Sequence, residues 1–341
     1  MKLPLLSLPL AVGLVGLLGA CKKADQVQPD KQAAPSQVTG AGSKTGVLLR
    51  PKWPLNNRYV YQLDMDQHST NKIPQMPTPM QQEVTMRLTY AVSVQKETTD
   101  GGRELELEFL ANSLEVRMGG RAVMSFDSKQ IADGDTRDPM AVPLRKMIGS
   151  KVRLLANQEG KVTKVLDLDI WREGLSLEEA GQPGQMLAQQ FNQGFFLLLA
   201  DSGRSLSPKP VTVGETWPFK AEFPAGATGK LAIDAKITLA GWENHAQRQC
   251  AILDSRGTLK GTTGDETGPM GKMTIDGGKL TGKAWFDPEL GANVEYVADQ
   301  FIHVKGEIPG QAIDNGAAAR FTSEIGQKIS VKLVELGKTK G

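Results

Sequence analysis

The sequence contains few of the residues that most often carry chemistry. Its 341 residues include two cysteines, Cys21 and Cys250, and three histidines, at positions 68, 245 and 303. Two cysteines exclude a disulfide framework and a cysteine-rich metal site, and the histidines form no local motif. We therefore expect no metal and no cofactor. Cys250 precedes an apolar stretch, and a lone thiol in such a strand usually serves as a small buried hydrophobe.

An excess of charge of one sign is also missing. Lys and Arg number 40 and Asp and Glu number 38, which leaves a formal net charge of +2. Nucleic-acid binding proteins usually carry a strong basic excess, so we expect no nucleic-acid partner. Aromatic residues make up only 6% of the chain, whereas 37 glycines and 19 prolines are present. Glycine and proline dominate turns, so this composition favours a turn-rich β protein.

Signatures of catalysis are absent too. The sequence has no Gly-x-Ser-x-Gly elbow, no His-Glu-x-x-His and no Cys-x-x-Cys, which excludes the common local motifs of hydrolases, zinc enzymes and redox proteins. We expect a protein without an evident catalytic site. The alternative is a hydrolase-like envelope enzyme whose site is assembled from distant residues. The candidates are Asp127, Asp201, His68 and His303, and their convergence in a cleft would favour it.

The first 21 residues predict export and lipidation. An apolar run over 3–18 follows Lys2 and ends in Leu18-Gly19-Ala20-Cys21. The run is shorter than the ~20 residues of a bilayer span and is typical of a signal peptide, expected here over 1–20. Its end resembles the lipobox of bacterial lipoproteins, which implies cleavage between Ala20 and Cys21 and acylation of Cys21. The alternative is an ordinary secretory signal that ends in Ala-Cys.

Residues 21–50 predict a tether between the membrane and the folded body. The stretch is polar until position 47, so it cannot bury enough apolar surface to fold. The partner is then the lipid bilayer, bound through acylated Cys21, and stable anchoring needs more than one acyl chain. Lys22 at the second position of the mature chain favours the outer membrane, with the body facing the periplasm.

From residue 51 to 341 the sequence predicts a single β-rich body. The segment 84–94 alternates apolar and polar residues, and 104–109 alternates Glu with apolar residues after the hairpin signal Asp100-Gly101-Gly102. We expect one set of side chains to face the core: Val84, Met86, Leu88, Tyr90, Val92 and Val94. Glu104, Glu106 and Glu108 should face solvent.

Strand follows strand, with short glycine turns, in the second part of the chain as well. We expect Gly277-Gly278 and 287–291 to be two of these turns. Such a series predicts one or more large curved antiparallel sheets, or a half-barrel, rather than alternating strands and helices. The body could consist of two similar halves, 51–170 and 211–341, joined by a helical segment over 171–205. Trp-Pro pairs at 53 and 217 head the two halves, which fits either a duplication or chance.

Two segments predict helices. Asp138-Pro139 introduces a short helix over about 139–148. A longer amphipathic helix is expected over about 185–201, packed on the sheet, with its apolar side chains at helical spacing. If this helix is a core plug, its side chains fill the sheet. If it is a lid, they line an apolar ligand cavity. The side chains concerned are Phe191, Phe195 and Leu198.

A family resemblance supports the same picture. Five segments carry it: Trp53-Pro54, 59–65, 101–107, 126–129 and 285–291. They resemble a family of bacterial lipoproteins and exported proteins that is defined only as a domain of unknown function. The resemblance covers essentially the whole body and implies export, but it brings no activity. We therefore expect a membrane-anchored envelope lipoprotein that binds an apolar or extended ligand, or an envelope partner, as a binding or scaffold protein.

Overall fold

The computed structural model describes most of the body. It covers residues 46–73, 76–130, 140–177, 179–181, 184, 187–188, 191–200, 203–224, 230–262, 273–308 and 319–339. The predicted signal peptide, Cys21 and nearly all of the predicted tether lie outside these residues. No helix in this part of the chain is long and apolar enough to cross a bilayer.

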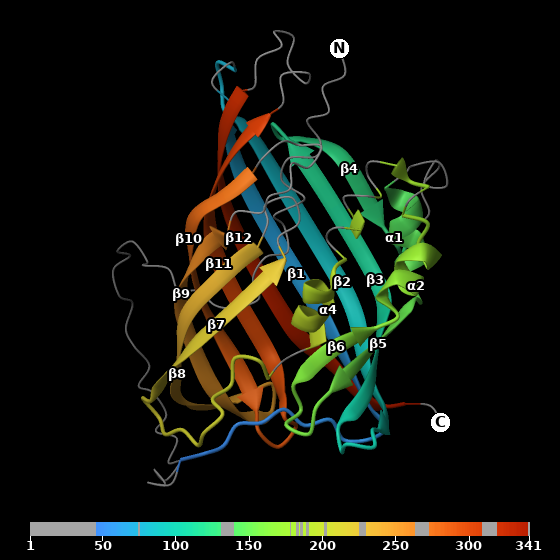
Figure 1. Cartoon of the computed structure of the whole chain (residues 1–341), viewed down its shortest axis with the longest axis vertical. Helices are drawn as coiled ribbons and strands as arrows, with labels where there is room; N and C mark the ends of the chain where they lie inside the picture. Colours follow the sequence, from blue (N-terminus) through green and yellow to red (C-terminus); the bar gives the residue numbers. More distant parts are fainter. Residues whose placement is uncertain are drawn as a thin grey trace.

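Twelve strands form one curved antiparallel sheet (Figure 1). The first six are β1 (Asn57–Lys72), β2 (Met80–Glu97), β3 (Arg103–Met118), β4 (Arg121–Asp127), β5 (Lys151–Ala156) and β6 (Val162–Leu166). The other six are β7 (Thr216–Pro224), β8 (Lys230–His245), β9 (Arg248–Thr262), β10 (Met273–Asp287), β11 (Ala292–Ile308) and β12 (Ala319–Lys338). The predicted mainly-β fold with a large curved antiparallel sheet is confirmed.

The order of the strands places the two ends of the body at the centre of the sheet. The order is β6-β5-β3-β2-β1-β12-β11-β10-β9-β8-β7, with β4 paired to β3. The first and last strands, β1 and β12, therefore join the two halves along their whole length. The path ends at β6 and β7, so the sheet is open between these two edges. The chain crosses from one edge to the other through the helical segment.

The period of two in the sequence sets which side chains face the core. In β2, the side chains of Val84, Leu88 and Tyr90 are at most 3% exposed, and Met86 is half-buried against the same core. The glutamates of β3 point the other way, are half-buried and form ion pairs with basic residues. Arg58 pairs with Glu108, Lys151 with Glu106, and Lys96 and Arg153 with Glu104. Both predicted faces are confirmed.

One predicted turn is wrong. Gly277 and Gly278 lie inside β10, which is a single strand from Met273 to Asp287. The register against β11 shifts between Ile275 and Gly277, and Gly277 has a φ of 139°. Such a φ favours glycine, so the pair makes a β-bulge that bends the strand without reversing it.

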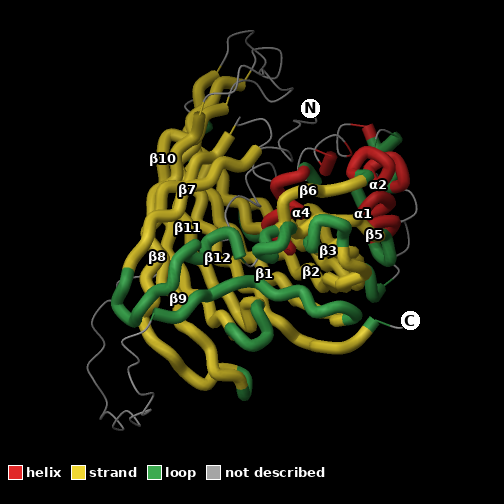
Figure 2. Tube along the Cα trace, turned by 60° about the horizontal axis from the view of Figure 1, so that its bottom comes forward, coloured by secondary structure: helices red, strands yellow, loops and turns green. Residues whose placement is uncertain are grey.

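In the described part of the chain, the short helices α1 (Ala141–Met147), α2 (Leu168–Gly174) and α4 (Gln193–Ala200) lie on one half of the sheet (Figures 1 and 2). Helix α1 confirms the short helix expected near 139–148. Its N-cap is Met140, which makes no side-chain cap hydrogen bond, and the expected cap at Asp138 lies outside the described residues. The sequence did not predict α2.

The long helix expected over 185–201 is interrupted. Leu187 and Ala188 are helical, but Phe191 and Asn192 form a bend, and α4 starts at Gln193. The Asn192 side chain explains the new start, because its Oδ1 accepts a hydrogen bond from Phe195 N at 3.2 Å. This is the bond of an N-cap residue.

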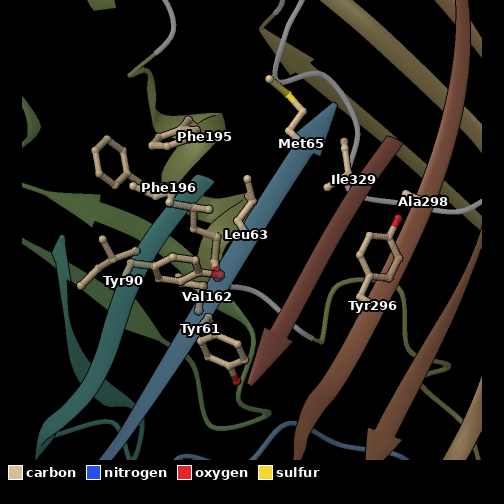
Figure 3. Close-up of a cluster of buried hydrophobic side chains, with 14 of the residues drawn as sticks. Tyr61, Leu63, Met65, Tyr90, Val162, Phe195, Phe196, Tyr296, Ala298 and Ile329 are labelled. Atoms are coloured by element: carbon tan, nitrogen blue, oxygen red, sulfur yellow. The ribbon is translucent and has the colours of Figure 1, made fainter. Parts of the chain in front are cut away.

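Helix α4 plugs the concave side of the first half. Phe196 is 0% exposed, and its ring lies 5.1 Å from that of Trp171 and 6.1 Å from that of Phe109. Tyr90 on β2 donates a hydrogen bond to Leu199 O at 2.9 Å. Figure 3 shows Phe195 and Phe196 over Tyr90, on the same concave side as the apolar side chains of the central strands.

The segment before β1 crosses one end of the sheet, shown in blue at the bottom of Figure 1. Val47 bridges to Val211, and Lys52 N donates to Gly291 O at 3.0 Å. Trp53 is buried, and its indole N–H donates to Gly160 O at 2.8 Å. In β7, Trp217 makes the equivalent contact with Ser205 O at 2.8 Å. Trp53 thus fastens the crossing segment to the turn at Gly160, and Trp217 fastens β7 to the loop at Ser205.

Candidate ligand-binding face

The four central strands β2, β1, β12 and β11 have faces of opposite chemistry. From Tyr61 to Asn71 on β1, and at the paired positions of β2, β12 and β11, the inward-facing side chains are buried or half-buried and include no Asp, Glu, Lys, Arg or His. Lys338, opposite Asn57, is a charged residue of the inner face at the other end of β12. Most other charged residues of the same strands lie on the convex face, where many pair with one another. An example is Lys72 Nζ, 3.1 Å from Glu324 Oε1. The concave face therefore suits an uncharged surface.

Toward the end of β1, polar side chains replace the apolar ones on this concave face. Met65 and Ile329 form the last apolar pair of the row shown in Figure 3. Beyond them lie seven uncharged polar side chains that are at most 5% exposed. We call this set the polar patch: Gln67, Ser69, Asn71, Gln82, Gln300, Ser323 and Gln327.

The strand register makes the polar patch continuous. Gln327 on β12 lies opposite both Gln67 on β1 and Gln300 on β11. Two residues further along β1, Ser69 lies opposite Gln82 on β2. In the next row, Asn71 lies opposite Ser323. Side chains opposite each other on one face of adjacent strands are within contact range, so the patch spans four neighbouring strands.

Most of the patch has unused hydrogen-bonding capacity. Gln327 Nε2 lies 3.5 Å from Gln67 Oε1 and 2.9 Å from Met65 Sδ. Five other side chains have buried polar atoms with no hydrogen-bond partner in the described part of the chain. They are Ser69, Asn71, Gln82, Gln300 and Ser323, and in the three amides both the oxygen and the nitrogen are unpaired.

These unpaired groups lower the free energy of unfolding by a large amount. A buried polar group without a partner costs about 1–3 kcal/mol, and folded proteins are stable by only about 5–15 kcal/mol in total. Five such side chains on one surface would therefore consume much of the stability of the fold. A group of this kind usually has a functional reason, so the polar patch is the candidate site.

The polar patch is distant from the helical plug. Helix α4 contacts the sheet at Tyr90, which donates a hydrogen bond to Leu199 O and lies opposite Tyr61 of β1. Gln67 lies six residues further along β1, which at ~3.3 Å per residue is about 20 Å. Aliphatic side chains such as Val84 and Ile302 lie beside the patch, and Phe321 lies next to Ser323 on the same face of β12. The patch and the plug therefore occupy different parts of the concave face.

The three side chains expected to line a ligand lie in the plug. Phe191 and Phe195 are 7% and 4% exposed, and Leu198 is half-buried. The Phe191 ring lies 5.4 Å from both Trp171 and Phe195. These rings fill the space between α2, α4 and the sheet. None of the three belongs to the polar patch.

The residues of the enzyme alternative are not brought together. His68 lies on the convex face of β1, 3.8 Å from Glu83. His303 lies exposed on the same face of β11, edge-on to Phe301. Asp127 ends β4 and accepts a hydrogen bond from Lys129 N, and Asp201 lies outside the described residues. Among the residues that the structure covers, no group of three acidic, His or Cys side chains could hold a metal.

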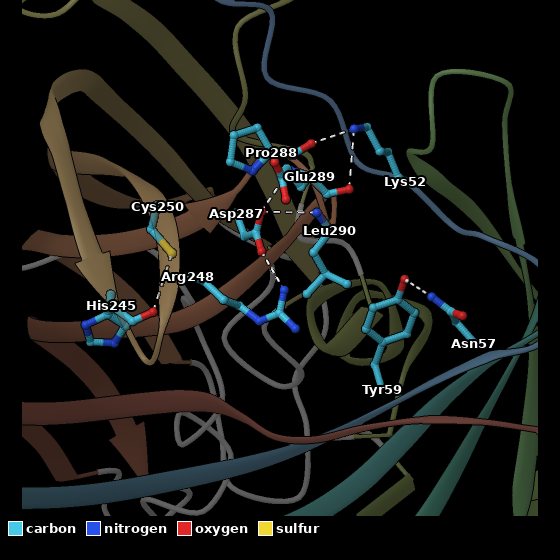
Figure 4. A network of polar contacts seen from close by, with 10 residues as sticks. All are labelled: Lys52, Asn57, Tyr59, His245, Arg248, Cys250, Asp287, Pro288, Glu289 and Leu290. Carbon is cyan, nitrogen blue, oxygen red and sulfur yellow. Dashed lines mark hydrogen bonds and ion pairs between the residues drawn. The ribbon is translucent and has the colours of Figure 1, made fainter. Parts of the chain in front are cut away.

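A second polar network, around Asp287, explains the segment 285–291 that carried the family resemblance (Figure 4). Asp287 is 3% exposed, and its Oδ1 accepts hydrogen bonds from the backbone N–H of Glu289 and Leu290. Its Oδ2 lies 2.8 Å from Arg248 NH1, and Lys52 Nζ donates to Pro288 O at 2.6 Å. The segment is a capped turn that holds the crossing chain.

A shallow hollow of about 320 Å³ lies beside this turn. Its lining residues are Ala246, Gln247, Arg248, Gln249, Asp287 and Glu289. Cys250 lies nearby and is 0% exposed, and burial raises the pKa of its thiol to about 11. A thiol that stays protonated is a poor nucleophile. The prediction of an inert, buried Cys250 agrees with this environment.

His245 is the last residue of β8, and Ala246-Gln247 make the turn that follows it, with positive φ. Its ring stacks on Trp285 at 4.5 Å, and its Nε2 lies 2.9 Å from Glu295 Oε2. Trp285 Nε1 donates to Glu243. These contacts tie three strands together across the convex face.

Fold and face together define a class of protein: an open antiparallel sheet with a charged convex side and an uncharged, partly polar concave side. Residues 100–291 match the model of a family of unknown function, DUF6263. The chain belongs to this family. No match was found among curated proteins.

Solved structures give only distant similarity. Lipovitellin, from a study of lipid–protein interactions, is 9% identical with a TM-score of 0.44; the match covers 85% of this chain, and the chain spans only 26% of lipovitellin. A DUF1329 family protein from Desulfovibrio piger is 9% identical with a TM-score of 0.14, over 84% and 88% of the two chains. A β-barrel-like DUF1849 protein from Brucella abortus is 12% identical with a TM-score of 0.15, over 86% and 100%. Scores this low carry no conclusion about function.

Proposed function

We propose that the protein is an exported, lipid-anchored envelope protein that binds an apolar or amphipathic ligand on the concave face of its sheet. The observation that carries the proposal is that five buried side chains of the polar patch have polar atoms without a hydrogen-bond partner in the described part of the chain, on a stretch of the face that has no charged side chain. A purely structural core would be apolar there, as it is around Tyr61 and Leu63.

The anchor follows from the sequence. Cleavage before Cys21 and acylation of its thiol would hold the body at the membrane through a tether of about 30 Å by the square-root law for flexible chains. The proposed location is the outer membrane, facing the periplasm. Cys21→Ser should abolish acylation and leave an unlipidated precursor, which intact-mass spectrometry would detect. A mature N-terminus other than residue 21 would contradict the proposal.

Ligand binding is tested first without assuming a ligand. The full-length protein is purified from its own membranes, extracted with organic solvent, and the extract analysed by mass spectrometry. We expect one lipid class in a near-stoichiometric amount. A parallel extract of Ser323→Lys should lose it, because a charge in the polar patch is incompatible with an apolar ligand.

The matched control is Thr322→Lys. Thr322 is the neighbouring residue on β12, is exposed, and points to the convex face, so this change adds the same charge without touching the patch. If Ser323→Lys fails to fold, Ser323→Phe blocks the patch without adding charge. Equal ligand content in all the variants would reject the concave face as the binding site.

A further inference from the structure

We infer that the polar patch binds the uncharged hydrogen-bonding groups of an amphipathic lipid, its ester or amide carbonyls and hydroxyls, while the acyl chain lies on the neighbouring aliphatic surface. This inference rests on the proposed function and names the class of ligand. It is argued from the donors and acceptors of the patch, from its lack of charge, and from its extent.

The polar patch offers both donors and acceptors. Asn71, Gln82 and Gln300 each have an unpaired carbonyl oxygen and an unpaired NH₂ group within the described part of the chain. An amide nitrogen donates two hydrogen bonds and its oxygen accepts two. The hydroxyls of Ser69 and Ser323 can do either. A ligand with carbonyl acceptors and hydroxyl or N–H donors would satisfy both kinds of group.

The lack of charge selects against anionic and cationic groups. Around the patch, from Tyr61 to Asn71 on β1 and at the paired positions of β2, β12 and β11, the inner face has no Lys, Arg, His, Asp or Glu. Lys338 lies on this face only at the opposite end of β12. A phosphate or carboxylate placed there would be buried without a counter-charge, which is strongly unfavourable. A charged headgroup would have to remain outside, so the portion of the ligand in the patch is neutral.

The extent of the patch indicates several hydrogen-bonding groups rather than one. Gln300 on β11 and Gln82 on β2 are three strand spacings apart, or about 14 Å at ~4.8 Å per spacing. A single hydroxyl cannot reach both. The glycerol-ester region of a lipid carries several carbonyl and hydroxyl groups, which can bond to different members of the patch. Ile302, Ile325 and Val84 lie between or beside these amides and provide the aliphatic contact.

The test uses three ligands with the same ten-carbon chain: 1-monodecanoylglycerol, decane and decanoate. Each displaces the fluorescent probe N-phenyl-1-naphthylamine from the purified full-length protein. In the double variant Gln82→Met, Gln300→Met we expect the concentration of monodecanoylglycerol needed for displacement, relative to that of decane, to rise about tenfold or more. This is the loss of two or more hydrogen bonds.

The matched control is Gln62→Met. The Gln62 amide lies on the convex face of β1 and donates to Asp64 Oδ2 at 2.7 Å, so the ratio should not change. If the probe still binds but the double variant leaves the ratio of monodecanoylglycerol to decane concentrations unchanged, this inference is overturned. The proposed function then still stands. The inference is also overturned, and the proposed function still stands, if decanoate displaces the probe better than monodecanoylglycerol. Failure of the probe and of all three ligands to bind overturns the proposed function itself.

Discussion

The plug formed by α4 gives the sharpest test of how the fold is held together. Phe196 is 0% exposed and contacts three other aromatic rings, those of Phe109, Trp171 and Phe195. Burial of a Phe side chain removes about 150–250 Å² from water, which at ~25 cal/mol per Å² is worth about 4–6 kcal/mol. Truncations of this kind cost about 3–5 kcal/mol in practice, and we expect Phe196→Ala to fall in that range.

The assay is urea unfolding followed by tryptophan fluorescence, because Trp171 lies in the same cluster. Phe301→Ala is the control: Phe301 is 42% exposed on the convex face of β11, and we expect a loss of about 1 kcal/mol or less. Amide hydrogen exchange provides a second measurement. In a plug, the amides of 193–200 should exchange only near the limit of global unfolding.

A lid would behave differently. If α4 opened locally, its amides would exchange fast while the central strands stayed protected. Phe196→Ala would then cost about 1 kcal/mol, because the side chain would gain little from burial that is only intermittent. Fast exchange together with a small cost of Phe196→Ala would refute the interpretation of α4 as a plug. It would support the ligand-lining role that the sequence suggested for Phe191, Phe195 and Leu198.

Three further outcomes are expected from buried groups. Asp287→Ala should cost about 2–4 kcal/mol by urea unfolding, because it removes two turn hydrogen bonds and a partner of the half-exposed Arg248; Asp287→Asn should recover part of the loss. Burial raises the pKa of Tyr61 and Tyr90 above the value of 10.0 in an unfolded chain, so the unfolded state releases protons first, and stability should be complete below about pH 10 and fall above it. Tyrosinate absorbance should then rise only together with unfolding, and a rise in the folded protein would contradict this. The Cys250 thiol, whose pKa is raised to about 11, should resist a thiol reagent at neutral pH until the protein unfolds.

The sheet could be predicted from the sequence because a strand shows its burial directly. In β2, alternate residues from Val84 to Val94 are apolar, and one strand face must then be buried. The same simple pattern does not specify how two glycines act. Gly277-Gly278 is compatible with a turn or with a bulge, and only the pairing of β10 with β9 and β11 decides for the bulge.

The helices were harder to predict because short helices depend on tertiary contacts. Helix α2 is seven residues long, with Ile170 67% exposed and only Trp171 buried, so it has no apolar stripe to detect. Within 185–201 the apolar spacing was visible, but the break was not. Asn192 ends one helical piece and caps the next, and a capping role can be recognised only where the backbone places Phe195 N above it.

The polar patch could have been found in the sequence of β1. From Tyr61 through Leu63 and Met65 the inward residues are apolar, and the same phase continues with Gln67, Ser69 and Asn71. Polar residues at core positions signal either a misassigned strand or a function. The matching residues on β12 and β11 could not be aligned with them without the register.

The polar patch and the contacts that stabilise the fold lie in different parts of the sheet. The first half is stabilised by its helices and aromatic cluster, and the crossing segment is fastened at Lys52 to the turn between β10 and β11, which begins at Asp287. Stability supplied there allows the opposite end of the central strands to retain polar groups that lower it. Natural proteins accept such local costs at functional sites. Replacing Gln300 by Met should accordingly preserve or raise the free energy of unfolding in the absence of ligand while weakening ligand binding. A core amide with a purely structural role would show the reverse.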